Sequence, residues 1–220
     1  MLGWRRLRWL LPAAVAIALA PVHLPALLLF PYKAEAAGFT VHSEAPLPPD
    51  QLRPILDDAA KRLSRSPITA GQHVDLYLTQ GGWRWRWLAL NAAGSFAVTR
   101  SLTGVSVFNR SDLARGVVQA PRKVGPERGL ASDIAHEATH TALYRHFGLW
   151  RIFNAPTWAV EGYCDHVAGE STLDQAAVAR LEALGIQHPA IDNYYGRLRV
   201  ERTLAANGGS VDRLFVEARD

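Results

Sequence analysis

Two histidines and a glutamate in the middle of the chain have the spacing of a metal-dependent hydrolytic site. His136, Glu137 and His140 form a His-Glu-x-x-His motif. Because an α-helix turns by about 100° per residue, His136 and His140 project from nearly the same face, one turn apart. Two imidazoles arranged in this way can bind one Zn²⁺, and Glu137 then lies beside the activated water as a candidate general base. The motif predicts a zinc site that needs a third ligand from elsewhere.

A second motif further along the chain offers that ligand. Glu161 and Asp165 form Glu-x-x-x-Asp on what reads as another helix. Cys164, the single cysteine, lies between them and can form no intramolecular disulfide. A thiolate ligand at Cys164 is conceivable, but a small buried side chain on a packed helix is the favoured interpretation. Cys164 is therefore not assigned to zinc.

Together the two motifs resemble those of the gluzincin metallopeptidases, the group of thermolysin and the aminopeptidase N type enzymes. The context Pro156-x-Trp158-x-x-Glu161-Gly162 is similar to that of the small bacterial peptidase-MA-like domains. The resemblance is strongest over residues 130–166 and weaker, as a pattern of elements, over roughly 38–216.

The resemblance implies a role for each residue of the two motifs. His136, His140 and Glu161 would be the zinc ligands. Glu137 would act as base and proton shuttle. Asp165 would accept a hydrogen bond from the back of His136 and so fix its tautomer.

One catalytic group remains to be assigned. In gluzincins a Tyr or His from the C-terminal helices stabilises the tetrahedral oxyanion together with zinc. The candidates here are Tyr194, Tyr195 and His188, and Tyr195 is taken as the prediction.

The function expected from this resemblance is hydrolysis of peptide or protein substrates by a zinc-dependent endopeptidase. An aminopeptidase is less favoured, because the sequence before the predicted zinc helix contains no separate acidic motif that could bind the free amine of a substrate. The alternatives are a zinc-binding but catalytically inactive, membrane-anchored module that captures peptide or cell-wall polymer, and a scaffold held at the membrane.

The hydrophobic periodicity predicts an α+β fold. We expect a small mixed sheet packed on the zinc helix and a mostly helical C-terminal half, which the resemblance identifies with a thermolysin-like core. Alternating apolar residues predict strands near 39–42, 73–79, 96–99 and 105–108. Apolar residues at helical spacing, with capping signals, predict helices near 52–63, 130–147, 158–168, 173–184, 189–206 and 210–218.

Three further segments each have more than one possible role. By the resemblance, strand 96–99 or strand 105–108 would pair with the substrate backbone. Residues 83–88 alternate Trp and Arg, which suits a ligand platform, although packing against the sheet or a membrane surface is favoured. Residues 114–129 predict a solvated basic loop, with a subsite for acidic substrates as the weaker alternative.

The N-terminus reads as an export signal. Arg5, Arg6 and Arg8 precede an apolar run from Trp9 to Phe30, broken only by His23 and prolines. This run is long enough for a hydrocarbon layer of about 30 Å. Positive charge before it directs the rest of the chain outward. A transmembrane signal-anchor is the favoured interpretation.

The alternative is a signal peptide with Ala34-Glu35-Ala36 as its cleavage site. The expected organisation is thus a signal segment at 1–37 and a peptidase domain at 38–220. In either case the domain is expected outside the cytoplasm, in a periplasm or at the cell surface, with the membrane as a partner of the N-terminal segment.

Composition argues against a nucleic-acid-binding protein. The formal net charge is only +4 over 220 residues, and the arginines are scattered rather than gathered in one basic stripe. We therefore expect no nucleic acid among the partners.

Overall fold

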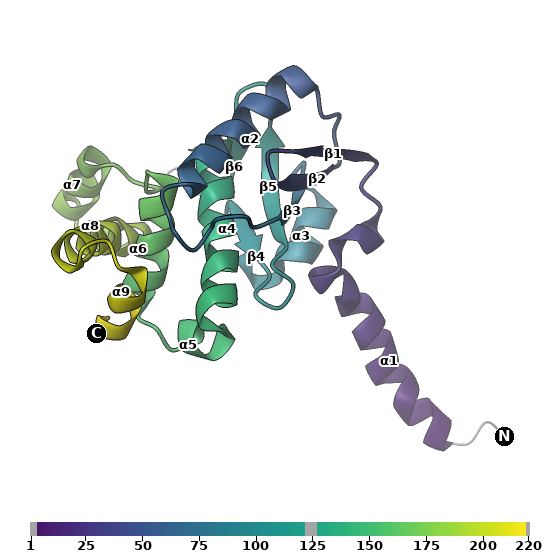
Figure 1. Cartoon of the computed structure of the whole chain (residues 1–220). Helices are drawn as coiled ribbons and strands as arrows, with labels where there is room; N and C mark the ends of the chain where they lie inside the picture. Colours follow the sequence, from purple (N-terminus) through teal and green to yellow (C-terminus); the bar gives the residue numbers. More distant parts are fainter. Residues whose placement is uncertain (1–3, 122–126, 219–220) are drawn as a thin grey trace.

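A mixed β-sheet lies against a long central helix, and the C-terminal helices pack beside that helix (Figure 1). The computed structural model describes residues 4–121 and 127–218. The predicted α+β class with a small mixed sheet is confirmed.

Seven strands form the sheet in the order β1-β2-β3-β5-β6-β7, with β4 also paired to β5. They are β1 (Tyr32–Ala36), β2 (Phe39–Ser43), β3 (Val74–Thr79), β4 (Ala97–Thr99), β5 (Ser106–Asp112), β6 (Val117–Gln119) and β7 (Glu127–Gly129). Strands β2, β3 and β5 run parallel, and every other pairing is antiparallel. Strand β4 pairs with one half of the outer edge of β5 and β6 with the other half, because Ala97 lies opposite Phe108 and Val118 opposite Ser111.

The helices agree with the predicted ones to within a few residues, and α1, α3 and α5 add to them. They are α1 (Trp4–His23), α2 (Pro49–Leu63), α3 (Trp83–Ala89), α4 (Leu130–Phe147), α5 (Leu149–Phe153), α6 (Thr157–Ala168), α7 (Gln175–Ala183), α8 (Pro189–Asn207) and α9 (Val211–Glu217). Two short 3₁₀ turns are η1 (Pro25–Leu28) and η2 (Leu90–Ala92).

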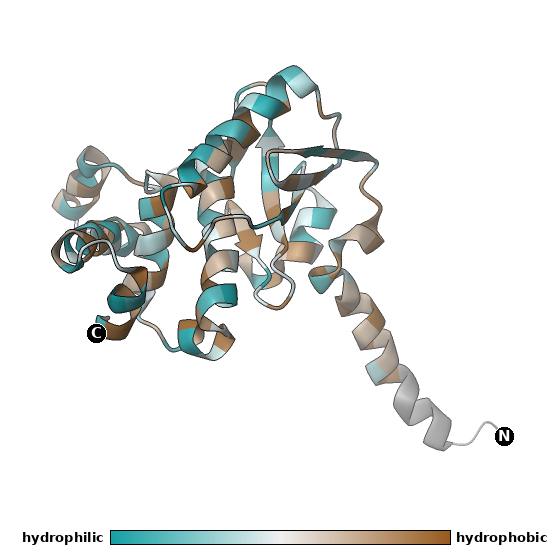
Figure 2. Ribbon diagram, in the orientation of Figure 1, coloured by the Kyte–Doolittle hydropathy of each residue, from teal (hydrophilic) through white to brown (hydrophobic). Residues whose placement is uncertain are grey.

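Successive side chains of β3 point to opposite faces of the sheet, and each face is covered by its own apolar cluster. Leu76 and Leu78 face the main core, which α2, α4 and α6 share, whereas Tyr77 faces a smaller cluster on the other side. Helix α2 shows hydrophilic and hydrophobic residues in turn along its length, as expected for a helix with one buried face (Figure 2). Trp85 of α3 is buried in the smaller cluster, so packing is the correct interpretation for this part of the Trp-Arg segment.

The loop predicted at 114–129 is only partly a loop. Strands β6 and β7 pair across it, with Val118 opposite Arg128, and Arg128 is buried rather than solvated. Residues 122–126 of this segment lie outside the described residues. The prediction failed because pairing between two three-residue strands leaves little trace in local periodicity.

The predicted transmembrane signal-anchor is wrong. Within residues 4–121 and 127–218, no helix has both the length and the apolar character required to cross a bilayer. The apolar run does not form one continuous helix: α1 begins at Trp4, among the arginines, and ends at His23, and the rest of the run lies in and around η1. A span needs about 20 consecutive apolar helical residues.

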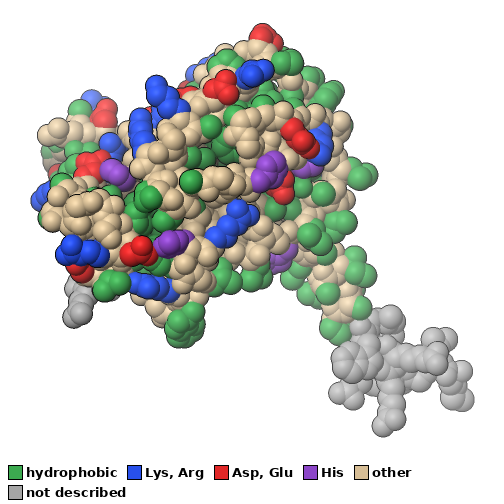
Figure 3. Space-filling model, in the orientation of Figure 1, with side chains coloured by type: hydrophobic (Ala, Val, Ile, Leu, Met, Phe, Trp, Pro, Cys, Tyr) green, Lys and Arg blue, Asp and Glu red, His purple; other side chains and the backbone are tan. Residues whose placement is uncertain are grey.

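Helix α1 projects from the domain (Figure 1), and hydrophobic side chains on its described part, among them Leu11 and Ile17, are exposed (Figure 3). Its C-terminal end is attached, because Val22 is buried and Trp87 Nε1 donates a hydrogen bond to the Ala18 carbonyl at 2.9 Å. The expected boundary at residue 37 falls in the turn between β1 and β2, so the last residues of the N-terminal segment belong to the sheet.

Candidate metal centre

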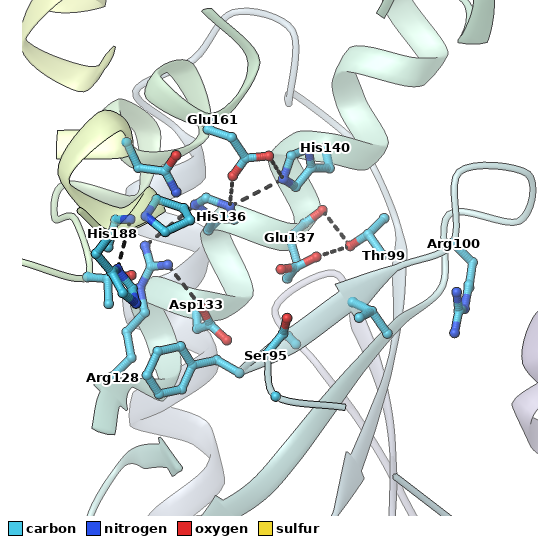
Figure 4. Close-up of a pocket in the computed structure, with 18 of the residues that line it drawn as sticks. Ser95, Thr99, Arg100, Arg128, Asp133, His136, Glu137, His140, Glu161 and His188 are labelled. Carbon is cyan, nitrogen blue, oxygen red and sulfur yellow. Dashed lines mark hydrogen bonds and ion pairs between the residues drawn. The ribbon is translucent and has the colours of Figure 1, made fainter. Parts of the chain in front are cut away.

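Helix α4 presents two imidazoles to one point. His136 and His140 lie one turn apart, with their Nε2 atoms separated by 3.2 Å and their ring planes inclined at 71° (Figure 4). The helix is buried over most of its length, so the rings cannot turn out to solvent without leaving their packing. Their Nε2 atoms therefore face one shared point.

Glu161 on α6 reaches both rings from the opposite side. Its Oε2 lies 3.5 Å from His136 Nε2 and its Oε1 lies 3.5 Å from His140 Nε2. In a tetrahedral site with bonds of about 2.0–2.2 Å, ligand atoms lie about 3.3–3.6 Å from one another. The two Nε2 atoms are 3.2 Å apart, and a different oxygen of Glu161 lies 3.5 Å from each of them, so the three side chains face one point at distances close to these.

Cys164 belongs to the same neighbourhood. One ligand atom each from His136, His140 and Cys164 lie within 4.8 Å of one another, so this buried cluster could hold a metal ion. The expected burial of Cys164 is confirmed, since the residue is fully enclosed in the main core. Burial raises the pKa of its thiol well above the usual value, and the carboxylates of Glu161 and Glu137 add to this effect.

Behind His136 lies a hydrogen-bonded cluster of three charged residues. His136 Nδ1 is 2.8 Å from Asp165 Oδ1, as the resemblance implied. Arg128 Nη2 donates to the same Asp165 oxygen at 2.8 Å, and its Nη1 lies 3.3 Å from Asp133 Oδ1. The three charged side chains are at most 7% exposed. The orientation of His136 is therefore fixed by a carboxylate that is itself held by a buried guanidinium.

Sequence reasoning missed Arg128 and Asp133. The available signal was Asp133, an acidic residue among the apolar residues of the helix that was expected to pack on the sheet. A carboxylate in such a place requires a nearby cation or hydrogen-bond donors.

These contacts set the charge of the site. Burial works to lower the pKa of His136, but the hydrogen bonds to Asp165 and Glu161 outweigh it and raise this pKa to about 10. Burial works to raise the pKa of Glu161, yet the two histidines lower it to about 2. For Asp165 the effect of burial is likewise outweighed, by His136 and Arg128, and its pKa falls to about 2. The metal-free site thus pairs an imidazolium with carboxylates.

Glu137 points away from the ligand set, into the cavity beside it. Its Oε2 accepts a hydrogen bond from Thr99 Oγ1 at 2.5 Å (Figure 4). Thr99 Oγ1 also lies 2.9 Å from Ser106 Oγ. Thr99 ends β4, the strand that lies nearest to α4 at this point. The sheet thereby fixes the carboxylate of Glu137 on the cavity side of His136.

An open cavity of about 430 Å³ connects these groups. Its wall includes consecutive residues 94–100, and its other lining side chains come from β7, α4, α6, the loop after α6 and the start of α8. The lining side chains that could bind an ion, transfer a proton or form a hydrogen bond include Arg128, Asp133, His136, Glu137, His140, Tyr144, Glu161, His188 and Asn193.

Tyr195 does not join this cavity, which corrects the prediction for the oxyanion-binding residue. Its hydroxyl donates to Glu182 Oε1 at 3.0 Å, and the residue is 46% exposed. On α8 the cavity is lined by Ala190 and Asn193, and a residue two positions after Asn193 points about 200° away from it. His188 at the start of α8 does line the cavity.

Comparisons of the chain with protein-family models, with curated proteins and with solved structures returned no match.

Proposed function

We propose that this protein is a zinc-dependent peptidase of the gluzincin type. One observation carries the proposal: two imidazole nitrogens 3.2 Å apart and a carboxylate with one oxygen 3.5 Å from each of them face a single point, and Glu137 lies beside them at a cavity. Three protein ligands leave one position open, as catalytic zinc sites require.

The donor set suits zinc. Two neutral imidazole nitrogens and one carboxylate oxygen are ligands that Zn²⁺ accepts readily in hydrolytic sites. Cys164 is a further donor nearby, but His136, His140 and Glu161 suffice for the ion. When bound, zinc supplies a Lewis acid that activates water and polarises the substrate carbonyl.

Glu137 is the proposed general base. Its carboxylate lies at the cavity and is oriented by the Thr99 hydroxyl, which leaves Oε1 free of any hydrogen-bonded partner in the described structure. Glu137 accepts a proton from the attacking water and then passes it to the departing amine.

His188 replaces Tyr195 as the proposed donor to the oxyanion. His188 caps α8, because its Nδ1 accepts a hydrogen bond from the Ala190 backbone nitrogen at 3.1 Å. An accepting Nδ1 places the proton of a neutral imidazole on Nε2. That N–H is then available to an oxygen in the cavity, where hydrogen-bond donors stabilise developing negative charge.

The peptide backbone is proposed to bind along β4. This strand pairs with β5 on one side, and no other described strand pairs with it. Residues 94–100, which contain β4, line the cavity. A free strand edge can pair with an extended peptide through main-chain hydrogen bonds. We infer that this sheet with α4 and α6 corresponds to the thermolysin-like core.

Replacing Glu137 by Gln tests the proposal. The zinc-loaded wild type should cleave members of a broad library of internally quenched peptides, and Glu137→Gln should lower kcat/KM by more than about a thousandfold while zinc content is unchanged. Glu182→Gln, at an exposed site on α7, is the matched control. A wild type that binds zinc and cleaves no peptide would instead support the inactive binding module.

A further inference from the structure

One buried carboxylate in the cavity has no place in this mechanism. Asp133 lies in the first turn of α4 and lines the same cavity as His136 and Glu137, with a side chain only 2% exposed. Its Oδ1 lies 3.3 Å from Arg128 Nη1. Its Oδ2 has no hydrogen-bond partner among the described residues. Since buried polar atoms are almost always hydrogen-bonded, this oxygen needs a partner from outside the described structure.

Asp133 shares its cation with a second carboxylate. Arg128 lies between Asp133 and Asp165, and its shorter contact, at 2.8 Å, is to Asp165. Asp165 also accepts a hydrogen bond from His136 Nδ1 at 2.8 Å, whereas among the described residues Asp133 is paired only with Arg128, through Oδ1. The other arginine that lines the cavity, Arg100, lies beyond Thr99, on the far side from Asp133 (Figure 4). The second oxygen of Asp133 is thus left without a cation in the described structure.

The walls of the cavity suit a long side chain with a charged tip. Phe96, Ala97 and Val98 line it together with Asp133. Apolar walls can pack against the methylene groups of lysine or arginine while a carboxylate receives the charged nitrogen.

We propose that Asp133 binds a cationic nitrogen of the substrate, an ammonium or a guanidinium. The substrates of the site are then peptides that present a lysine or arginine side chain, or a free terminal amine, at this end of the cavity. This rests on the proposed function, because it places the substrate in the cavity beside the metal ligands. The bound cation pairs with Oδ2, the oxygen that Arg128 does not contact.

Binding of small hydroxamates to the zinc-loaded full-length protein tests the proposal. The probes are the hydroxamates of lysine and norleucine, each with a free and with an acetylated α-amine. Norleucine replaces the charged side-chain nitrogen of lysine by a methyl group. The wild type should bind acetylated lysine hydroxamate about tenfold or more tightly than its norleucine counterpart if the side chain is the cation. If the α-amine is the cation, the free amines should bind correspondingly better than the acetylated forms.

The variant Asp133→Asn keeps the size and removes the charge, and it should reduce either preference to within about twofold. Asp57→Asn, on the exposed face of α2, should leave the preference unchanged. Zinc content and thermal unfolding are measured on every variant. If Asp133→Asn does not fold, the binding affinities of the wild type for the four probes remain as the test. Equal binding of the cationic and neutral probes by the wild type overturns the proposal.

A preference that persists in folded Asp133→Asn also overturns it, as does a failure of zinc-loaded protein to bind any of the four probes. These outcomes are separate from failure of the proposed peptidase, since binding requires no peptide hydrolysis. Loss of the metal site would already show as absence of zinc before a probe is added.

Discussion

Glu161 Oε2 lies 3.5 Å from His136 Nε2, although the two residues belong to different helices. This contact depends on how α6 is held against α4 and α8. Gly162, the residue next to Glu161, lies against Gly196 of α8 so closely that a Cβ atom on Gly162 would overlap the Gly196 backbone. The position of Glu161, the proposed third ligand, is therefore fixed by an approach of two helices that only glycine permits.

Gly162→Ala should disturb both the fold and the metal site. The added methyl group must push α6 and α8 apart, and overpacking of this kind costs typically about 1–3 kcal/mol. Because Glu161 moves with the helix, zinc affinity should fall as well. Denaturant unfolding and zinc titration measure the two effects. Gly82→Ala is the control, since its Cβ would meet no atom within 4 Å; equal effects of the two variants would contradict this account.

Thr99→Val should slow catalysis without weakening substrate binding. Valine has the shape of threonine but leaves Glu137 Oε2 without its hydroxyl donor. A hydrogen bond to a charged group contributes about 1.5–3 kcal/mol, so kcat should fall by roughly 10- to 100-fold with little change in KM. Thr99→Ser should restore most of the rate. An unchanged kcat in Thr99→Val, or no rescue by serine, would show that Thr99 does not position the base.

Zinc affinity should increase with pH. The pKa of His136 in the metal-free protein is about 10, so its ring is protonated at neutral pH, whereas a zinc ligand must be neutral at Nε2. Binding must release this proton, and the zinc association constant should rise about tenfold per pH unit between pH 6 and 8. Competition with a chelator of known affinity measures it. The same affinity at both ends of this range would contradict a protonated His136.

The raised pKa of His136 also predicts how the metal-free protein responds to pH. A histidine with a folded pKa above its unfolded value of about 6.5 stabilises the fold fully below that value. This contribution should disappear as the pH rises through about 10. Unfolding curves of the metal-free protein at pH 6 and pH 10 test the sign, with His136→Gln as the variant in which the difference should shrink.

Arg128→Met should be among the most destabilising single changes at the site. It leaves the buried carboxylates of Asp133 and Asp165 without their shared cation, and removing one partner of a buried ion pair costs about 3–5 kcal/mol. Adding Asp133→Asn to this variant should recover part of the loss. Arg115→Met, which breaks an exposed pair with Glu127, is the matched control and should change stability little. Similar denaturation midpoints for the two single variants would contradict the role of Arg128.

The sequence predicted what depends on spacing within one element. His136 and His140 lie one turn apart wherever a helix forms, and apolar residues four positions apart, from Leu130 to Ala142, were enough to locate α4 although the helix is buried on most sides. The contact between Asp165 and His136 came from a resemblance and agrees with the structure.

Features that depend on how separate elements meet were not predictable in this way. Arg128 is buried because β7 pairs with β6, and two three-residue strands give no clear periodic signal. Tyr195 and His188 both lie near the start of α8, but only the rotation of that helix decides which one faces the cavity. The long apolar run at the N-terminus suggested one helix, and the structure divides it at His23.

The most direct test of the central claim is the zinc content and zinc affinity of the wild type beside Glu161→Ala. The wild type should bind one zinc ion per chain. Loss of a residue behind a ligand already costs about 10- to 100-fold in affinity, so loss of the ligand itself should cost more than about a hundredfold. Glu201→Ala, which removes a carboxylate from α8 outside the site, should bind zinc as the wild type does. A wild type that binds no zinc, or a Glu161→Ala variant with unchanged affinity, would contradict the account.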